Sequence, residues 1–181
     1  MKNLATKKNI KLASNVLTST EILAQLAFNE NFRIRSAVAS NTSASDETLA
    51  QLAKDDDESV RSSVALNASA SAELLDQLAD DDDYCIRCIV ALNTSTSNET
   101  LAKLAFNEFK SDKFIKSVVA RNTSSNVETL VNLAKEDDDS IKYAVAKNTS
   151  TPSETLAQLA KDDNKSIRYA VALNTSTPPL S

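Results

Sequence analysis

Two cysteines three residues apart are the side chains of this sequence best suited to chemistry. Cys85 and Cys88 enclose Ile86 and Arg87, and two thiols at this spacing near a helix start can have lowered pKa values and form a redox pair. Both cysteines, however, occupy positions that other parts of the chain give to serine, and such redox motifs usually accompany a βαβ pattern, which is absent. Thiol redox chemistry is therefore the third-ranked hypothesis for this chain.

Runs of aspartate are the other candidate for a chemical site. They lie at residues 55–57, 80–83, 137–139 and 162–163. Clustered carboxylates suit a hard cation, but an EF-hand loop needs a glycine and the chain has none. Placement at helix N-termini, where the backbone favours negative charge, explains these runs more simply. We therefore predict no bound metal and no cofactor.

The composition argues against conventional catalysis. The chain contains no histidine, the commonest general base near neutral pH, and without glycine it has no phosphate-cradling loop. A formal charge of −5 and a pI of about 4.8 disfavour general binding to nucleic acid or anionic lipid. No segment resembles a signal peptide or spans a bilayer. We expect a cytoplasmic protein that is not an enzyme and does not bind a membrane.

An asparagine occupies the same place in seven copies of one motif, with gaps of 26, 26, 26, 29, 26 and 26 residues. A period of this size is typical of a solenoid, whose units are stable only when stacked. We predict an all-α solenoid of about six 26-residue, two-helix repeats. It forms a single domain, 1–181, with an N-terminal cap at 1–14, repeats at 15–174 and an incomplete repeat at 175–181. Because this last end lacks an obvious cap, we expect either that the sequence is a piece of a longer array or that this end pairs with a second copy of the chain. The repeated asparagines are Asn15, Asn41, Asn67, Asn93, Asn122, Asn148 and Asn174.

The first helix of a repeat is clearest after Asn148. Thr151 is predicted to cap it, with Pro152 at the first helical position and Glu154 completing a capping box. Three other repeats have a hydroxyl residue at the same capping position, namely Thr18, Thr96 and Ser125. Leucines at i and i+3 then form its buried stripe. Ala44 and Ala70 take the place of Thr151 in two other repeats, where we expect a loss of about 1 kcal/mol each because alanine cannot cap.

The second helix is predicted to begin after an Asn or Asp three residues before its first aliphatic residue. It ends at the repeating asparagine. Because the chain lacks glycine, we expect this asparagine to adopt the left-handed conformation of a helix C-cap. The predicted N-caps are Asn31, Asp57, Asp83, Asp112, Asp138 and Asn164.

One motif recurs from about residue 12 to 178 and reads Ile-Arg-x-Ala-Val-Ala-Leu-Asn-Thr-Ser-Thr-Pro-x-x-x-Leu-x-x-Leu-Ala-x-Asp. It resembles the leucine-rich repeat variant family, a relative of HEAT-type repeats. The resemblance implies a right-handed superhelix of paired helices, one of them partly 3₁₀. It implies no single activity, and we do not carry over the iron–sulfur cluster of the family's founding example. By analogy with HEAT repeats, the Arg or Lys after each core aliphatic residue should bond acidic helix caps in the same or the next repeat.

A helical wheel separates the buried face of each second helix from the face it displays. In each second helix, three positions lie opposite the core and should face solvent. Counted from the first core aliphatic residue, they are the residue before it, the second residue after it and the sixth residue after it. By the HEAT resemblance this face would line a groove, and exposed aromatic and arginine side chains are typical partner anchors. The predicted partner-binding residues are Leu66, Leu92, Phe114, Arg121, Tyr143, Lys147, Tyr169 and Leu173.

The sequence therefore predicts a non-enzymatic scaffold that binds a protein or peptide. The alternative is nucleic-acid binding through a local basic stripe of Arg33, Arg121 and Lys147. Three extra residues between Ala105 and Ile115 mark an irregular repeat, which either forms a binding loop or places Phe109 in the core.

Overall fold

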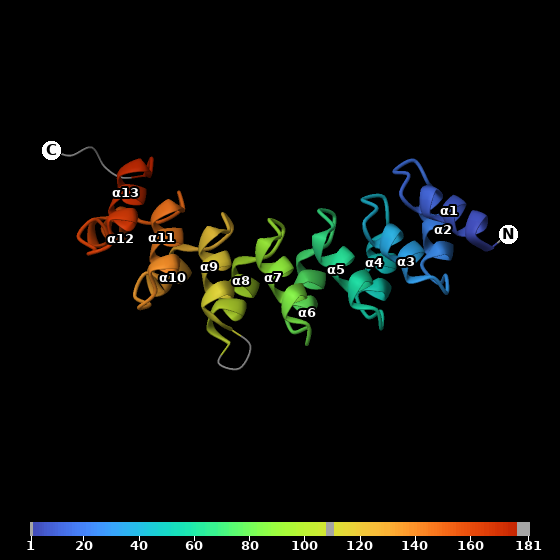
Figure 1. Ribbon diagram of the computed structural model, residues 1–181, viewed down its shortest axis with the longest axis horizontal. Helices are drawn as coiled ribbons and strands as arrows, with labels where there is room; N and C mark the ends of the chain where they lie inside the picture. The colour runs from blue at the N-terminus through green and yellow to red at the C-terminus, as the bar shows by residue number, and fades with distance from the viewer. Residues whose placement is uncertain (1, 108–110, 177–181) are drawn as a thin grey trace. The chain divides into compact units, whose positions relative to one another are not determined.

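The computed structural model describes residues 2–107 and 111–176, and over these residues the chain is all-α with 13 helices (Figure 1). Helix α1 (Lys2–Ala13) precedes six helix pairs, which confirms the predicted solenoid of two-helix repeats. The first helices of the pairs are α2 (Thr20–Leu26), α4 (Asp46–Leu52), α6 (Ala72–Leu78), α8 (Asn98–Phe106), α10 (Val127–Leu133) and α12 (Ser153–Leu159). The second helices are α3 (Phe32–Ala39), α5 (Glu58–Leu66), α7 (Tyr84–Leu92), α9 (Lys113–Arg121), α11 (Asp139–Lys147) and α13 (Lys165–Leu173).

The helices group into two compact units. Unit 1 is Met1–Ser95 and contains α1 to α7, and unit 2 is Thr96–Ser181 and contains α8 to α13. In unit 1 the helices α1, α3, α5 and α7 pack in a row, and in unit 2 the helices α9, α11 and α13 do the same. First helices pack against the second helices of their own repeat. The second helices therefore carry most of the stacking within each unit.

The core follows the predicted apolar spacing. In the first helices, leucines such as Leu49 and Leu130 are fully buried, and in the second helices the aliphatic residues at i and i+4, such as Ile141 and Val145, are also buried. Every described first helix is α-helical, including those of only seven residues. The partly 3₁₀ geometry implied by the family resemblance is therefore wrong for this chain.

The predicted cap of the first helix is wrong by one residue. The side-chain caps are Ser45, Ser71, Ser97 and Asn126, one position after the predicted residues. At α12 that position is Pro152, which offers no side-chain hydrogen bond. Helices α4 and α6 are thus capped by Ser45 and Ser71 although Ala44 and Ala70 precede them. The predicted loss of stability through a missing cap at these two helices is therefore wrong.

The hydroxyl groups predicted as caps bind the preceding helix instead. Thr18 donates to the carbonyl of Leu12, Ser125 to that of Val119 and Thr151 to that of Val145, each at 2.7 Å. They add a second hydrogen bond to carbonyls in the last turn of a helix, each of which also accepts the backbone N–H of the repeating asparagine. These three hydroxyls thus connect one helix end to the next helix start.

The repeating asparagine is also not a left-handed cap. Among the described residues none has positive φ, and Asn148 is extended with φ −73° and ψ 124°. Its side-chain nitrogen donates to the carbonyls of Ala120 (2.8 Å) and Asn122 (3.0 Å) in the preceding repeat, while its oxygen accepts from the backbone N–H of Ser150 (2.8 Å). The side chain is 5% exposed. Asparagine is therefore needed for its donors and acceptor, which no glycine has.

The same three bonds recur along both units and form an asparagine ladder. Each donor reaches back 28 residues to the last turn of the preceding second helix and 26 residues to the preceding asparagine. The same bonds are made by Asn41, Asn67, Asn93 and Asn174. Since buried carbonyls without a partner are costly, the ladder fixes the register of one repeat on the next.

A second ladder joins basic and acidic side chains at the other end of the second helices. In unit 1, Nε and Nη2 of Arg35 donate to the carboxylate of Asp55 in the next repeat at 2.6 and 2.8 Å, and Nη1 donates to the carbonyl of Asn29 at 2.8 Å. The hydrogen bond from Arg35 holds the pKa of Asp55 below its ordinary value. Equivalent ion pairs are Arg61–Asp81, Lys116–Glu136 and Lys142–Asp162. The basic residues therefore bind acidic residues of the next repeat, as predicted, but each partner lies two positions before the helix cap that was predicted to bind.

We predict that Asn148→Asp destabilises the protein by about 2–4 kcal/mol, because the variant keeps the shape of the side chain but removes both N–H donors. The buried carbonyl of Ala120 then loses its side-chain donor, and that of Asn122 keeps only the backbone N–H of Ser125. Asn148→Ala should cost a similar amount. Chemical denaturation followed by circular dichroism measures both. Ser150→Ala, at an exposed position beside the ladder, is the control and should change stability by less than about 0.5 kcal/mol. Equal stability of Asn148→Asp and wild type would contradict the ladder's role.

Stability should fall in acid partly through Asp55. Because its folded-state pKa is lowered, the stabilisation from its pairing is complete above the unfolded-state value of about 3.9 and is lost as the pH falls through the folded-state value. Asp55→Asn should therefore lower stability at neutral pH and weaken its dependence on pH below about 4. Denaturation midpoints across this range measure both effects. Asp56→Asn, at an exposed neighbouring residue, should behave like wild type, and an unchanged acid dependence in Asp55→Asn would disprove the assignment.

Candidate functional site

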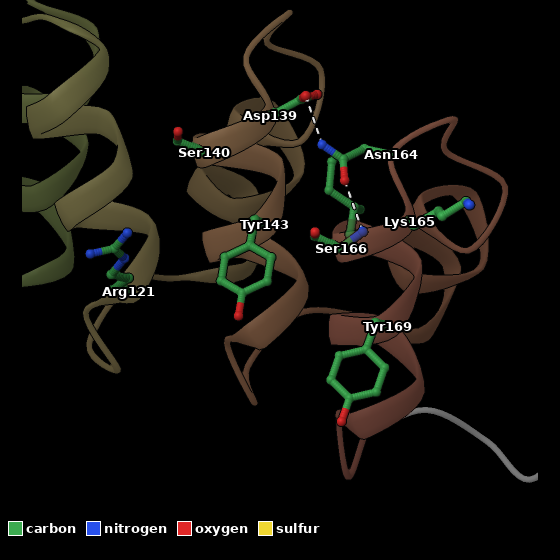
Figure 2. Close-up of a pocket in the computed structure, with 9 residues that line it drawn as sticks. Arg121, Asp139, Ser140, Tyr143, Asn164, Lys165, Ser166 and Tyr169 are labelled. Carbon is green, nitrogen blue, oxygen red and sulfur yellow. Dashed lines mark hydrogen bonds between the residues drawn. The ribbon is translucent and has the colours of Figure 1, made fainter.

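A groove in unit 2 brings together several of the predicted partner-binding residues. Arg121 on α9, Tyr143 on α11 and Tyr169 on α13 line it, and its volume is about 530 Å³. Figure 2 shows the two tyrosine rings on neighbouring helices with their hydroxyl groups pointing the same way, and Arg121 on the other side of Tyr143 from Tyr169. Tyr169 is 65% exposed. The spacing of one repeat thus places two aromatic rings in one groove.

A smaller hollow of about 380 Å³ adjoins Tyr143. Arg121, Tyr143 and Lys147 line it. The Lys147 ammonium lies 5.8 Å from the centre of the Tyr143 ring, a distance at which a cation is attracted to the ring face. Arg121 and Lys147 are both exposed. This end of the groove therefore combines an aromatic surface with two positive charges.

The other end of the groove is polar. Asn164 donates from its side-chain nitrogen to Asp139 at 2.7 Å, and its side-chain oxygen accepts from the backbone N–H of Ser166 at 2.8 Å (Figure 2). Asp139 and Lys165 line this end. We did not predict Asp139, Asn164 or Lys165 as site residues. In the sequence these residues stand out only as a helix cap or as part of the first turn after one. Capping already explained their residue types, so nothing in the sequence indicated a binding role.

In unit 1 the predicted residues line a shallower hollow. Leu66 on α5 and Leu92 on α7, which are 67% and 60% exposed, border a cavity of about 210 Å³ together with Ile89. Phe114 and Leu173 are 55% and 63% exposed at the ends of α9 and α13, and neither lines the unit 2 groove. Exposure thus agrees with the helical wheel at these positions.

The helical wheel is wrong for the middle position of two second helices. Cys88 on α7 and Ser117 on α9 are buried although they were expected to face solvent. The wheel considers one helix alone, whereas neighbouring second helices pack directly against one another and cover this position. The question of whether the irregular repeat places Phe109 in a loop or in the core falls on residues outside the described range.

The basic stripe of the nucleic-acid hypothesis is divided between the units. Arg33 lies in α3 of unit 1, with its guanidinium carbon 5.8 Å from the centre of the Phe32 ring. Arg121 and Lys147 share the hollow beside Tyr143 in unit 2. Only the last two residues of the stripe therefore belong to one described site.

The aspartate runs have structural roles. Asp57, Asp83 and Asp138 cap second helices with their side chains, as predicted, while Asp55 and Asp81 form ion pairs. Within residues 2–107 and 111–176 no group of three or more His, Cys, Asp or Glu is arranged to hold a metal ion. Both cysteines lie in the described region without a disulfide, Cys85 exposed and Cys88 buried.

Comparison with known proteins gives matches among solved structures alone. No protein-family model and no curated protein sequence matches the chain. A structure described as "a leucine-rich repeat variant with a novel repetitive protein structural motif" is 22% identical, covers 88% of this chain and 73% of its own, and has a TM-score of 0.40. A designed armadillo repeat protein is 17% identical, with coverages of 91% and 96% and a TM-score of 0.43. The chain is similar to these two helical-repeat structures.

None of the helices in the described part of the chain has the length and apolar character needed to cross a membrane.

We predict that the two thiols react at different rates in the folded protein, because Cys85 is exposed and Cys88 is buried. A chromogenic disulfide reagent should label one thiol quickly, and the second only on unfolding. The Cys85→Ser variant should lose the fast phase and Cys88→Ser should keep it. If instead the untreated protein contains an intramolecular disulfide that reductant removes, the redox hypothesis is supported.

Proposed function

We propose that this protein is a non-enzymatic repeat scaffold that binds a protein or peptide along the exposed face of its second helices. The observation that carries the proposal is the unit 2 groove, where Tyr143 and Tyr169 are aligned one repeat apart beside Arg121. Tyrosine and arginine are over-represented among residues that dominate binding energy. Such repeat scaffolds are typically not catalytic. The remaining residues of the proposed surface are Leu66, Leu92, Phe114, Lys147 and Leu173.

The geometry favours an extended segment of the partner over a small ligand. The groove is open, and its lining comes from three successive second helices. A segment lying across these helices would contact the same structural position once per repeat. Each tyrosine offers a large rigid surface at low conformational cost.

Nucleic-acid binding is the rival function and is less well supported. Arg121 and Lys147 offer two positive charges beside a tyrosine, but Asp139 lines the same groove and the whole chain has a formal charge of −5. A nucleic-acid strand would bring a phosphate to every nucleotide, and its affinity would fall steeply with added salt.

Selection from a random peptide library tests the proposal. Wild-type protein should enrich specific peptides, and Tyr143→Ala/Tyr169→Ala should bind them at least about 30-fold more weakly, equivalent to about 2 kcal/mol. Phe106→Ala/Val127→Ala removes two exposed apolar side chains from first helices of the same unit and should bind like wild type. Circular dichroism confirms that both variants are folded.

Two outcomes would contradict the proposal. One is that no peptide is enriched above a display background. The other is that single-stranded RNA or DNA oligonucleotides bind at low salt, bind much less at moderate salt and require Arg121 and Lys147, which would favour the nucleic-acid alternative.

A further inference from the structure

Four basic side chains on α9 and α11 fall into two groups. Lys116 and Lys142 each pair with a carboxylate of the following repeat, at 2.7 and 3.2 Å. Arg121 and Lys147, one turn further along the same two helices, form no ion pair with any described residue. The first group therefore has a structural role, while the second keeps its charge available at the groove.

The unpaired charges lie together at one end of the site. Arg121 and Lys147 line the hollow beside Tyr143, and no carboxylate is part of that lining. The nearby groove contains one acidic side chain, Asp139, at the opposite end, where it already accepts a hydrogen bond from Asn164. A ligand carboxylate placed at the hollow would thus meet two cations and no local repulsion.

The charge of the chain is unevenly distributed between the two units. Residues 96–181 contain equal numbers of basic and acidic residues, so the formal charge of −5 arises from residues 1–95. Unit 2 therefore has no net charge to repel an anion, and two of its cations, Arg121 and Lys147, lie beside the Tyr143 ring.

From this arrangement we infer that the partner is an acidic peptide segment, which seats an Asp or Glu between Arg121 and Lys147 and lays apolar side chains over Tyr143 and Tyr169. This inference rests on the proposed function and adds the chemistry of the partner. Arginine binds a carboxylate through two parallel N–H groups, and Lys147 is held over the Tyr143 ring.

A nucleic acid fits this arrangement less well. The position of Arg121 and Lys147 in the next second helix is Leu173, so the basic row covers two repeats and then stops. A phosphate backbone needs positive charge along its whole track. A peptide with one or two acidic residues needs it only at the hollow, which is what unit 2 offers.

The test is the charge of peptides selected from a random library of unstructured peptides. Wild-type protein should enrich peptides that combine Asp or Glu with apolar residues, and replacing the acidic residues of a selected peptide by Gln or Asn should weaken binding about tenfold or more. The variant Arg121→Glu/Lys147→Glu should bind the original acidic peptides at least about tenfold more weakly and select basic ones instead. The matched control Lys103→Glu/Lys135→Glu changes the net charge equally on first helices or just after them, and should leave the selection acidic.

The outcomes separate this inference from the proposed function. If neutral or basic peptides are selected and their binding requires Tyr143 and Tyr169, the scaffold proposal holds and the acidic partner is wrong. If both charge-reversal variants weaken binding equally, only the net charge matters and the seat between Arg121 and Lys147 is wrong. If no peptide is enriched, or a single-stranded oligonucleotide binds instead, both proposals fail.

Discussion

The structure of each unit depends on one interaction, the burial of an asparagine amide between backbone groups of adjacent repeats. The chain leaves each second helix in an extended conformation, and the carbonyls there lie too deep for water to reach them. The asparagine amide satisfies two of them and one N–H of its own turn. Because the donors and acceptor are fixed on one short side chain, they set both the spacing and the register of the stack.

Sequence periodicity predicts the parts of this fold that depend on local chemistry. The leucine stripes, the aliphatic pairs and the Asn or Asp caps of the second helices all follow from side chains within one turn of each other. The roles of Asn148 and Thr151 could not be obtained this way. The partner of Asn148 lies 28 residues back and that of Thr151 six residues back, both outside the helix that the local pattern describes. The local pattern instead favours a capping role for each polar side chain at the nearest helix end.

The residues of the candidate site could also be predicted only as far as the pattern within one helix reaches. A helical wheel identifies Tyr143, Tyr169 and Arg121 as displayed side chains, but it contains no neighbouring helix and so misses the burial of Cys88 and Ser117. It also cannot distinguish paired from unpaired cations. That distinction comes from the ion pairs of Lys116 and Lys142, which separate the side chains that hold repeats together from those that remain for a partner.

The constant reach of the asparagine ladder bears on how an array of this kind changes length in evolution. The amides of Asn41, Asn67, Asn93, Asn148 and Asn174 all find their acceptors 26 and 28 residues back. Gain or loss of one whole period by unequal recombination would therefore leave such an amide facing acceptors of the same kind. A shift of a few residues is tolerated only away from the ladder. The one irregular spacing fits this rule, because its three extra residues lie away from the ladder. Two of them lengthen α8, which has nine residues where the other first helices have seven, and one lengthens the connection between α8 and α9.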